Sequence, residues 1–316
     1  MEFFKQKTNI DFLGVRKWSW SLSAILVLAS IFLVIFRGLN WDLDFTGGYA
    51  IQVHYQQTAD LSKIRAELEK VGINHADAIT FGSTHDVMLR LAPRQDMTKQ
   101  SFSSQGKTEQ DFLTAAVQSA LGPAARIVQV SYTGPEVGAQ LAETGMLAML
   151  IAVLATMIYI ALRFEMRFAV SAAIALAHDP IIILGVFSLF QIRFDLTALA
   201  AVLAVIGYSL NDTVVVYDRI RENFRKLRKS PVIEVVNRAI NDTLSRTIMT
   251  SGLTLVVVVV LFVCGGPSIH YFALALIIGI VVGTYSSIYV AGALAVAFGL
   301  NRQALLPTEK QVDDTP

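Results

Sequence analysis

Six apolar runs, each long enough to cross a bilayer, constrain the fold of this chain more than any other feature of its sequence. A transmembrane helix needs about 20 predominantly apolar residues. Only 16% of the 316 residues are charged, whereas soluble domains carry about 25%. The expected fold class is therefore a membrane α-helical bundle of six transmembrane helices. The runs occupy residues 18–37, 144–162, 168–190, 196–217, 247–264 and 271–298.

The long polar region at residues 38–141 predicts an inserted α+β domain. Its alternation of apolar and polar residues predicts four strands and two helices in the order βαββαβ, which is that of a split-βαβ, ferredoxin-like domain. Residues 93–106 are interpreted as a polar loop. The expected elements are strands at 49–55, 78–81, 87–91 and 126–131 and helices at 61–71 and 108–121.

Lysines and arginines mark three segments that flank the spans. Such segments lie preferentially in the cytoplasm, so both termini are expected inside and the polar domain outside. In the longest of them, apolar side chains at helical spacing predict a helix at 231–240 against the cytoplasmic face. The expected organisation is an amphipathic interfacial segment at 1–17, a first span at 18–37, the outside domain at 38–141, a five-helix region at 142–300 with a cytoplasmic loop at 218–246, and a disordered tail at 301–316.

Asp212, between Asn211 and Thr213, stands in the apolar run 196–217. A carboxylate inside a bilayer costs about 2.5–3.5 kcal/mol on insertion scales and is a functional candidate by default. Desolvation disfavours its ionised form, and a proton relay requires a group that takes up and releases a proton. The alternative is a structural ion pair that holds two helices together.

Arg246 opens the fifth span, followed by the hydroxyl residues Thr247, Thr250 and Ser251. One interpretation is an anchor whose guanidinium reaches the membrane surface. The other is a permanent positive charge for Asp212, because antiparallel packing of the fourth and fifth spans would place the two at the same membrane level. The spacing alone favours neither.

The third span carries a second polar group, His178 and Asp179, followed by Pro180. These residues lie about ten positions into the span, or roughly 15 Å deep. A proline removes one backbone hydrogen bond and can bend a helix. A structural kink with His178 hydrogen-bonded in the bundle and a functional polar site are equally compatible with this pattern.

The sixth span contains Gly279 and Gly283, whose small-xxx-small spacing lets two helices approach closely. We interpret this motif as helix packing, while the hydroxyls of Ser286 and Ser287 that follow it can line a polar path.

Motifs for other chemistry are absent from the sequence. It contains no phosphate-binding loop of the Gly-x4-Gly-Lys-Ser/Thr type, no His-Glu-x-x-His and no Gly-x-Ser-x-Gly. Five scattered histidines and the single Cys264 predict neither a metal site nor a disulfide within the chain. The formal net charge of +1 gives no reason to expect nucleic-acid binding. We therefore expect a protein without cofactor that is not an enzyme.

Several stretches, in order along nearly the whole chain, resemble the SecF family, the smaller subunits of bacterial SecDF complexes. The most specific is Gly-Tyr-Ser-Leu-Asn-Asp-Thr at 207–213, which runs on into Asp-Arg-Ile-Arg-Glu-Asn at 218–223. The others are Asp-Phe-Thr-Gly-Gly at 44–48, Arg-Phe-Glu-Met-Arg-Phe at 163–168, Ala-His-Asp-Pro at 177–180, Ser-Arg-Thr at 245–247, Thr-Ser at 250–251 and Gly-Thr-Tyr-Ser-Ser at 283–287.

This resemblance implies six spans of the resistance-nodulation-division type and a periplasmic ferredoxin-like domain in the bacterial inner membrane. It implies SecD, the SecYEG translocon, YajC and YidC as partners, and an exported preprotein as the chain acted upon. Asp212 and Arg246 match the charged pair through which the family conducts protons. A further family carboxylate belongs to SecD, so this chain alone is expected to hold an incomplete relay.

The function expected from the residues and the resemblance together is a proton-motive-force-driven subunit that assists protein export without ATP. Two alternatives stay open. One is a scaffold whose charged residues serve helix packing alone, and the other is half of a small-molecule efflux pump of the same superfamily. The modest size of the outside domain argues against the efflux pump.

Overall fold

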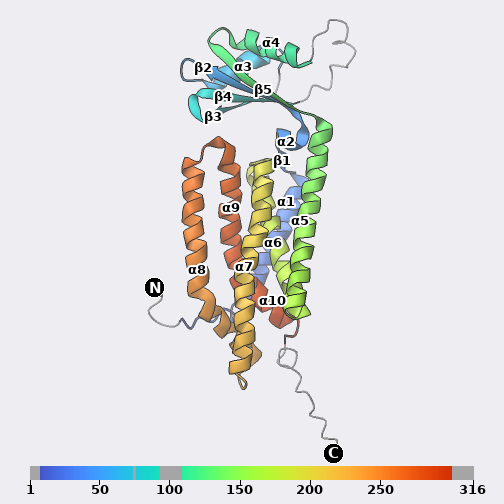
Figure 1. Ribbon diagram of the computed structural model, residues 1–316, viewed down its shortest axis with the longest axis vertical. Coiled ribbons are helices and arrows are strands. Elements are labelled where there is room, and N and C mark those ends of the chain that lie inside the picture. Colours follow the sequence, from blue (N-terminus) through green and yellow to red (C-terminus); the bar gives the residue numbers. More distant parts are fainter. Residues whose placement is uncertain (1–7, 74–75, 93–108, 301–316) are drawn as a thin grey trace, which may run out of the picture.

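The protein consists of a helical bundle with a small sheet domain at one end (Figure 1). The computed structural model describes residues 8–73, 76–92 and 109–300. Among these residues, six helical stretches are long and apolar enough to cross a membrane, as the sequence predicts. The first five are α1 (Arg16–Phe36), α5 (Pro135–Arg163), α6 (Met166–Phe190), α7 (Leu196–Lys226) and α8 (Val232–Cys264). The sixth is divided into α9 (Pro267–Tyr285), the π-helical segment η1 (Ser286–Ala291) and α10 (Gly292–Ala297).

The sheet domain has the predicted βαββαβ order. Its elements are β2 (Gly48–Tyr55), α3 (Leu61–Lys70), β3 (Asp77–Phe81), β4 (Ser83–Leu91), α4 (Glu109–Leu121) and β5 (Ala125–Thr133). The strand order is β3-β4-β2-β5 with every pair antiparallel, which is the ferredoxin-like arrangement. Ile51 lies opposite Leu89 on one side and Val130 on the other. Both helices pack on one face of the sheet, where Leu68 and Val117 join its buried core.

A junction connects the sheet domain to the bundle. Strands β1 (Asn40–Trp41) and β6 (Arg193–Phe194) pair in parallel, and the short helix α2 (Leu43–Thr46) follows β1. Gly48 then enters β2 with φ of 137°, and an added Cβ would overlap the Leu91 carbonyl oxygen. Only glycine fits there, because the backbone conformation and the close approach both exclude a side chain.

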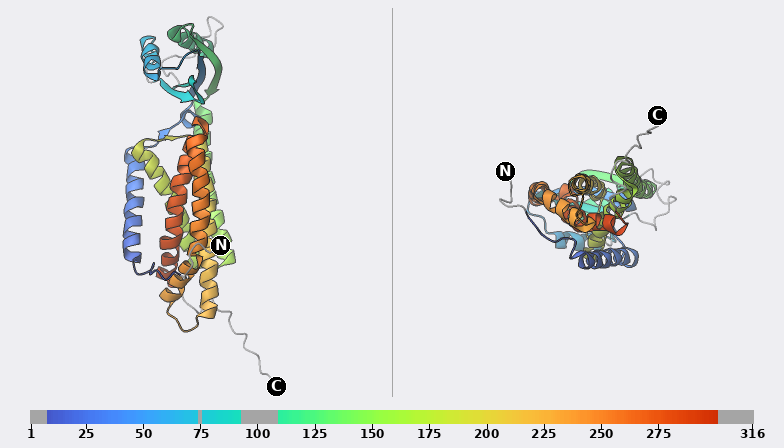
Figure 2. Two further views of the ribbon diagram at one scale, coloured as in Figure 1. Left: turned by 90° about the vertical axis from the view of Figure 1, so that its left-hand side faces the viewer. Right: turned by 90° about the horizontal axis from the view of Figure 1, so that it is seen from below.

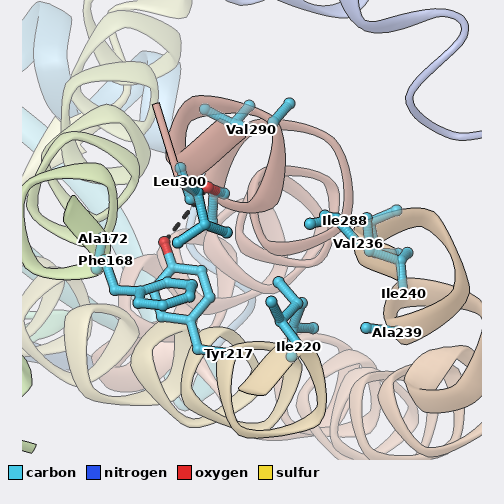
Figure 3. Packing of buried hydrophobic residues seen from close by; sticks show 14 of the residues in the cluster. Phe168, Ala172, Tyr217, Ile220, Val236, Ala239, Ile240, Ile288, Val290 and Leu300 are labelled. Carbon is cyan, nitrogen blue, oxygen red and sulfur yellow. Dashed lines mark hydrogen bonds between the residues drawn. The ribbon is translucent and has the colours of Figure 1, made fainter. Parts of the chain in front are cut away.

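Helices α6, α7 and α9 form the centre of the bundle, and about half of each is buried. Helices α1, α5 and α8 are largely exposed and lie around them (Figure 2). At the end opposite the sheet domain, here called the far end, a large apolar cluster joins α6, α7, α8 and η1 (Figure 3). The fully buried Tyr217 contributes its ring to this cluster, while its hydroxyl lies 2.8 Å from Ser171 Oγ and 3.3 Å from the Ala291 carbonyl.

Two expectations about the far end need correction. Residues 231–240 are helical as predicted, but from Val232 on they form the first part of α8 and not a separate helix. Helix α7 also continues to Lys226, so the predicted loop 218–246 shrinks to residues 227–231. The buried side chains of Val235, Val236 and Ile240 explain both results, because they dock the start of α8 on the apolar cluster.

Part of the interfacial segment 1–17 is also tied to α8. Phe12 and Leu13 are buried in the far-end cluster, and their backbone N–H groups donate to Asn237 Oδ1. The loop at 93–106, the tail at 301–316 and residues 1–7 lie outside the described residues.

Candidate functional site

Two carboxylates are buried within the central helices of the bundle. Asp212 on α7 is 3% exposed, and Asp179 on α6 is fully buried. In the described part of the chain, neither forms an ion pair with a lysine or arginine. Because an ionised group in an apolar bundle must be paired or neutralised, these two positions are the candidate sites for proton exchange.

Hydroxyl groups, rather than a cation, contact the Asp212 carboxylate. Ser251 Oγ on α8 donates to Asp212 Oδ2 over 3.4 Å. Thr284 Oγ1 on α9 lies 2.9 Å from Ser251 Oγ and so extends the chain of hydroxyls to a third helix. Thr250 also lies beside the carboxylate. The side chain of Asp212 thus faces the interior between α7, α8 and α9.

Arg246 lies near Asp212 without forming an ion pair with it. Its charge acts on the Asp212 carboxylate, but among the described residues the two side chains are not joined by an ion pair. Ser251, which contacts the carboxylate, lies five residues after Arg246 on α8, or about 7.5 Å along a helix. Arg246 therefore stands on the far-end side of Ser251, and its charge reaches Asp212 through space.

A cavity at the far end holds Arg246. Its volume is about 480 Å³, and residues from α5, α7 and α8 line it. Asp218, Glu222 and Asp242 contribute carboxylates to its wall, and Val215, one helical turn from Asp212, belongs to its lining. The cavity therefore places a permanent positive charge among carboxylates at the far end, within about one helical turn of Asp212 along α7.

Asp179 is the centre of a separate polar cluster. Its Oδ1 lies 2.9 Å from His178 Nδ1. Its Oδ2 accepts from Ser209 Oγ of α7 over 2.6 Å and lies 3.1 Å from Ser286 Oγ of η1. One carboxylate therefore joins three of the central segments of the bundle. Helix α6 continues through Pro180 without ending.

The two glycines of the sixth span stand where α9 lies close to its neighbours. A Cβ at Gly279 would overlap Val205 Cγ2 of α7, and one at Gly283 would lie 3.3 Å from both Asp179 Oδ2 and Ser209 Oγ. Gly283 thus allows α9 to approach the Asp179 cluster closely.

Other predicted site residues lie away from the carboxylates. Asn211 is exposed, on a different face of α7 from the buried Asp212. Thr213 Oγ1 bonds to the Ser209 carbonyl of its own helix, and Ser287 Oγ likewise bonds to the Thr284 carbonyl. Thr247 is buried near the start of the transmembrane part of α8.

Sequence reasoning missed Ser209 as a partner of Asp179 and Thr284 as the neighbour of Ser251. Ser209 lies three residues before Asp212, on a neighbouring helical face. This spacing is only a weak sign of a site residue, because serines in helices often bond to the backbone of their own helix. Within the described residues, no group of three or more His, Cys, Asp or Glu side chains could hold a metal ion.

Comparisons with known proteins agree with this architecture. Residues 113–301 match the family described as protein export membrane protein SecD/SecF, C-terminal, and residues 32–59 match the SecD/SecF GG motif. The second match covers the glycine pair of the junction.

Two relatives described as protein translocase subunit SecF match along nearly their full length. The chain is 46% identical to that of Vibrio alginolyticus over 308 residues, covering 98% of this chain and 96% of the relative. It is 42% identical to that of Escherichia coli O157:H7, covering 97% and 94%.

Among solved structures, the chain is similar to SecDF from Thermus thermophilus, described as a translocon-associated membrane protein. The TM-score is 0.80 and the sequence identity 34%; the match covers 94% of this chain and 39% of that one, so this chain corresponds to well under half of the longer protein. These matches extend over both the sheet domain and the bundle. The chain therefore belongs to the SecD/SecF family of protein export membrane proteins, in which its full-length relatives are the SecF subunits.

Proposed function

We propose that this multi-pass membrane protein is a subunit of a proton-motive-force-driven complex that assists protein export through the Sec translocon. In this proposal, proton passage through the bundle is coupled to movement of the sheet domain. The full-length SecF relatives and the translocon-associated SecDF structure support the export role. In this proposal SecD is the direct partner, and SecYEG, YajC, YidC and the exported preprotein are the further partners.

The observation that carries the proton coupling is the environment of Asp212. Its carboxylate lies in the bundle interior, with hydroxyls as neighbours and no cation in contact. An ionised carboxylate without an ion pair is unfavourable there, so proton uptake removes an unfavourable charge. Arg246 cannot lose its own proton. It therefore keeps a fixed charge beside the far-end cavity in both states of Asp212.

The orientation follows from charge. The far end carries Arg163, Arg219, Arg221 and Arg225, and basic residues favour the cytoplasmic side. Helix α1 begins and α10 ends at this same far end (Figure 1). In the proposed arrangement, both termini are in the cytoplasm, and the sheet domain lies in the periplasm of a bacterial inner membrane.

The energy available is sufficient for a change in helix packing. One elementary charge that crosses 100 mV contributes about 2.3 kcal/mol, so a few protons supply several kcal/mol per cycle. Helix α5 begins at Pro135, directly after the end of β5 at Thr133. A rearrangement of α7 against its neighbours can therefore reach the sheet domain through a continuous chain, as a two-state change driven by a local charge event.

Asp212→Asn tests the proposal, because it keeps the shape of the side chain and removes its titration. In the assembled complex with SecD, we expect export stimulated by the proton-motive force to fall to the level of vesicles without the complex. Glu67→Gln neutralises a partly exposed carboxylate of the sheet domain and should keep full stimulation.

The yield of complex separates coupling from a scaffold role. Asp212→Asn should assemble with SecD as well as the unaltered chain does. Full stimulation in this variant would contradict the relay role of Asp212, and loss of assembly in parallel with loss of export would favour the scaffold.

A further inference from the structure

Asp179 is more deeply buried than Asp212, yet the proposed relay does not use it. Its carboxylate contacts α6, α7 and η1 at once, through His178, Ser209 and Ser286. Gly283 of α9 completes the enclosure, because a side chain at this position would press on Asp179 Oδ2. Because this acidic group is completely buried between three helical segments, its negative charge must be balanced by a neighbouring group or removed by a proton.

The charges around Asp179 can be assigned element by element. Helix α6 contributes His178, α7 contributes the neutral Ser209, and the sixth span contributes the neutral Gly283 and Ser286. Tyr285 stacks its ring on His178 with centroids 6.4 Å apart. Across residues 8–73, 76–92 and 109–300, no lysine or arginine forms an ion pair with this carboxylate. The charge of an ionised Asp179 is therefore balanced by His178 or not at all.

This arrangement favours a state in which His178 and Asp179 together hold at least one proton more than in the state with a neutral imidazole and an ionised carboxylate. An unbalanced negative charge with no access to water is strongly unfavourable. A neutral carboxyl beside a neutral imidazole, or a carboxylate beside an imidazolium, removes that charge. Both have the Oδ1 to Nδ1 contact of 2.9 Å that the structure shows.

Ser286 is placed to follow a change in protonation. Its hydroxyl carries one proton and faces two oxygens at the same distance of 3.1 Å, Asp179 Oδ2 and the Gly283 carbonyl. When Oδ2 is ionised, Ser286 donates to it. When Oδ2 carries a proton, the carboxyl donates to Ser286 Oγ, and Ser286 turns its own proton to the Gly283 carbonyl. Both states are fully hydrogen-bonded with the same positions of the heavy atoms.

His178 supplies an independent indication. Its Nε2 is buried and has no hydrogen-bond partner in the structure, although the side chain is 5% exposed. Unpaired buried polar atoms are rare and call for an explanation. A ring nitrogen that accepts a proton on the way to or from the carboxylate explains this one, since Nδ1 is already engaged with Asp179.

We propose that His178 and Asp179 form a second proton-binding site of the bundle, at which one proton is taken up and released while Ser286 reverses its hydrogen bond. The binding site stands on the geometry of this cluster. Its part in export rests on the proposed function, because a proton here matters for export only if the bundle is driven by protons.

The sixth span connects this site to Asp212. Thr284 reaches Asp212 through Ser251, and Ser286, two residues later, contacts Asp179. On α7, Ser209 lies one helical turn before Asp212. A proton bound at either carboxylate therefore acts on the same two helices, so the two sites are expected to influence each other's occupancy.

Infrared difference spectroscopy tests the site directly. The full 316-residue chain, assembled with SecD in lipid nanodiscs, is compared at mildly acidic and mildly alkaline pH. We expect a protonated-carboxyl band that Asp179→Asn removes and Asp212→Asn leaves in place. Ser286→Ala should shift this band without abolishing it, because the carboxyl keeps its proton but loses one hydrogen-bond partner.

Each other result overturns the site. A difference spectrum that is unchanged in Asp179→Asn shows that Asp179 contributes no band, and an Asp179 band present at every pH shows a permanently protonated structural carboxyl. A band that responds to sodium at constant pH shows that these oxygens hold a metal cation instead. If Asp179→Asn does not assemble, an unchanged band in Ser286→Ala equally contradicts the proposal.

The two proposals fail separately. Loss of export in Asp212→Asn combined with a silent Asp179 overturns the second site alone. A titrating Asp179 in a chain whose Asp212→Asn variant exports at full rate overturns the coupling role of Asp212 and leaves the second site in place.

Discussion

Buried carboxylates in this protein differ in what balances their charge. Asp42, at the junction, forms ion pairs with Arg90 and Arg193. Asp195 caps the start of α7 by accepting from the Ala198 N–H over 2.7 Å. Asp212, in contrast, has only uncharged groups in contact with it. Asp42 and Asp195 thus have a cation or a helix N-terminus beside the carboxylate, whereas Asp212 has hydroxyl groups.

The charge of Arg246, rather than its shape, should matter for function. Because it acts on Asp212 across space and lines the far-end cavity, Arg246→Lys keeps a positive charge there and should retain measurable coupling. Arg246→Met removes the charge and should reduce proton-dependent export stimulation at least tenfold, which corresponds to about 1.4 kcal/mol. Equal activity of the two variants in export assays would show that Arg246 is only a membrane anchor.

Asp42 should make the junction sensitive to pH. Burial raises the pKa of Asp42 above its ordinary value of 3.8, although Arg90 and Arg193 pull it the other way. The folded junction thus binds this proton more tightly than the unfolded chain does. Its contribution to stability is fully present below 3.8 and is lost as the pH rises through the raised pKa.

Trp41 offers a measurement of that effect, since its ring packs against Phe45 and Phe194 at the junction. With Trp18 and Trp20 replaced by phenylalanine, thermal unfolding can be followed by Trp41 fluorescence. We expect the midpoint to fall with rising pH in this background and to change less when Asp42→Asn is added. Identical pH slopes would contradict the assignment.

At the scale of elements, the sixth span is the one that the sequence describes least well. The apolar run 271–298 predicts a single helix, whereas the structure places the π-helical turn Ser286–Ala291 within it. Tyr285 and Tyr289 stack on each other beside this turn, with ring centroids 5.3 Å apart. π-helical turns frequently occur at functional sites, and here the turn carries the hydroxyl of Ser286 to Asp179.

Close contact between α7 and α9 should depend on Gly279. Gly279→Ala would force its Cβ into Val205, and overpacking of this kind costs about 1–3 kcal/mol. Val205→Ala in the same chain should recover most of that loss, because it removes the overlapping methyl groups. Chemical unfolding in detergent micelles measures all three variants.

Gly252→Ala provides the matched control for this prediction. Gly252 also lies within a transmembrane helix, but nothing stands within 4 Å of an added Cβ there. The control should be neutral or stabilising by up to about 1 kcal/mol. Equal effects at Gly252 and Gly279 would mean that the small-xxx-small motif does not determine the packing of α9.

At the scale of the whole molecule, the junction decides how the sheet domain is held on the bundle. Arg193, from the β6 strand between α6 and α7, forms ion pairs with Asp77 of the sheet domain and with Asp42. Asp44 Oδ2 also accepts from the Leu196 N–H at the start of α7. Side chains that follow α1 and α6 therefore position the domain, in addition to its covalent link to α5.

Arg193→Ala should loosen this attachment. We expect the distance between spin labels on the sheet domain and on the bundle to become more broadly distributed, because two buried or half-buried ion pairs are lost. Lys70→Ala removes only an exposed pair with Glu67 and should leave the distribution unchanged. An unaltered distribution in Arg193→Ala would show that the covalent connections alone fix the domain.

Local sequence determined the helices and strands of this protein and its leading candidate for a functional residue. Apolar length alone predicts six spans, and short alternating patterns predict the βαββαβ domain, because both signals depend on neighbouring residues. Asp212 is identifiable for the same reason, since a carboxylate in an apolar run is costly wherever the run packs.

Only the tertiary structure decided which groups meet. Ser251 reaches Asp212 from 39 residues away, and Ser286 reaches Asp179 from 107 residues away. These contacts depend on how each helix is rotated and how far it is shifted along its neighbour. With a different rotation or shift, other hydroxyl residues of the same spans would face the two carboxylates. The apolar repeat sets which residues are helical, but interlocking side chains such as Gly279 with Val205 set the register that brings the polar groups together.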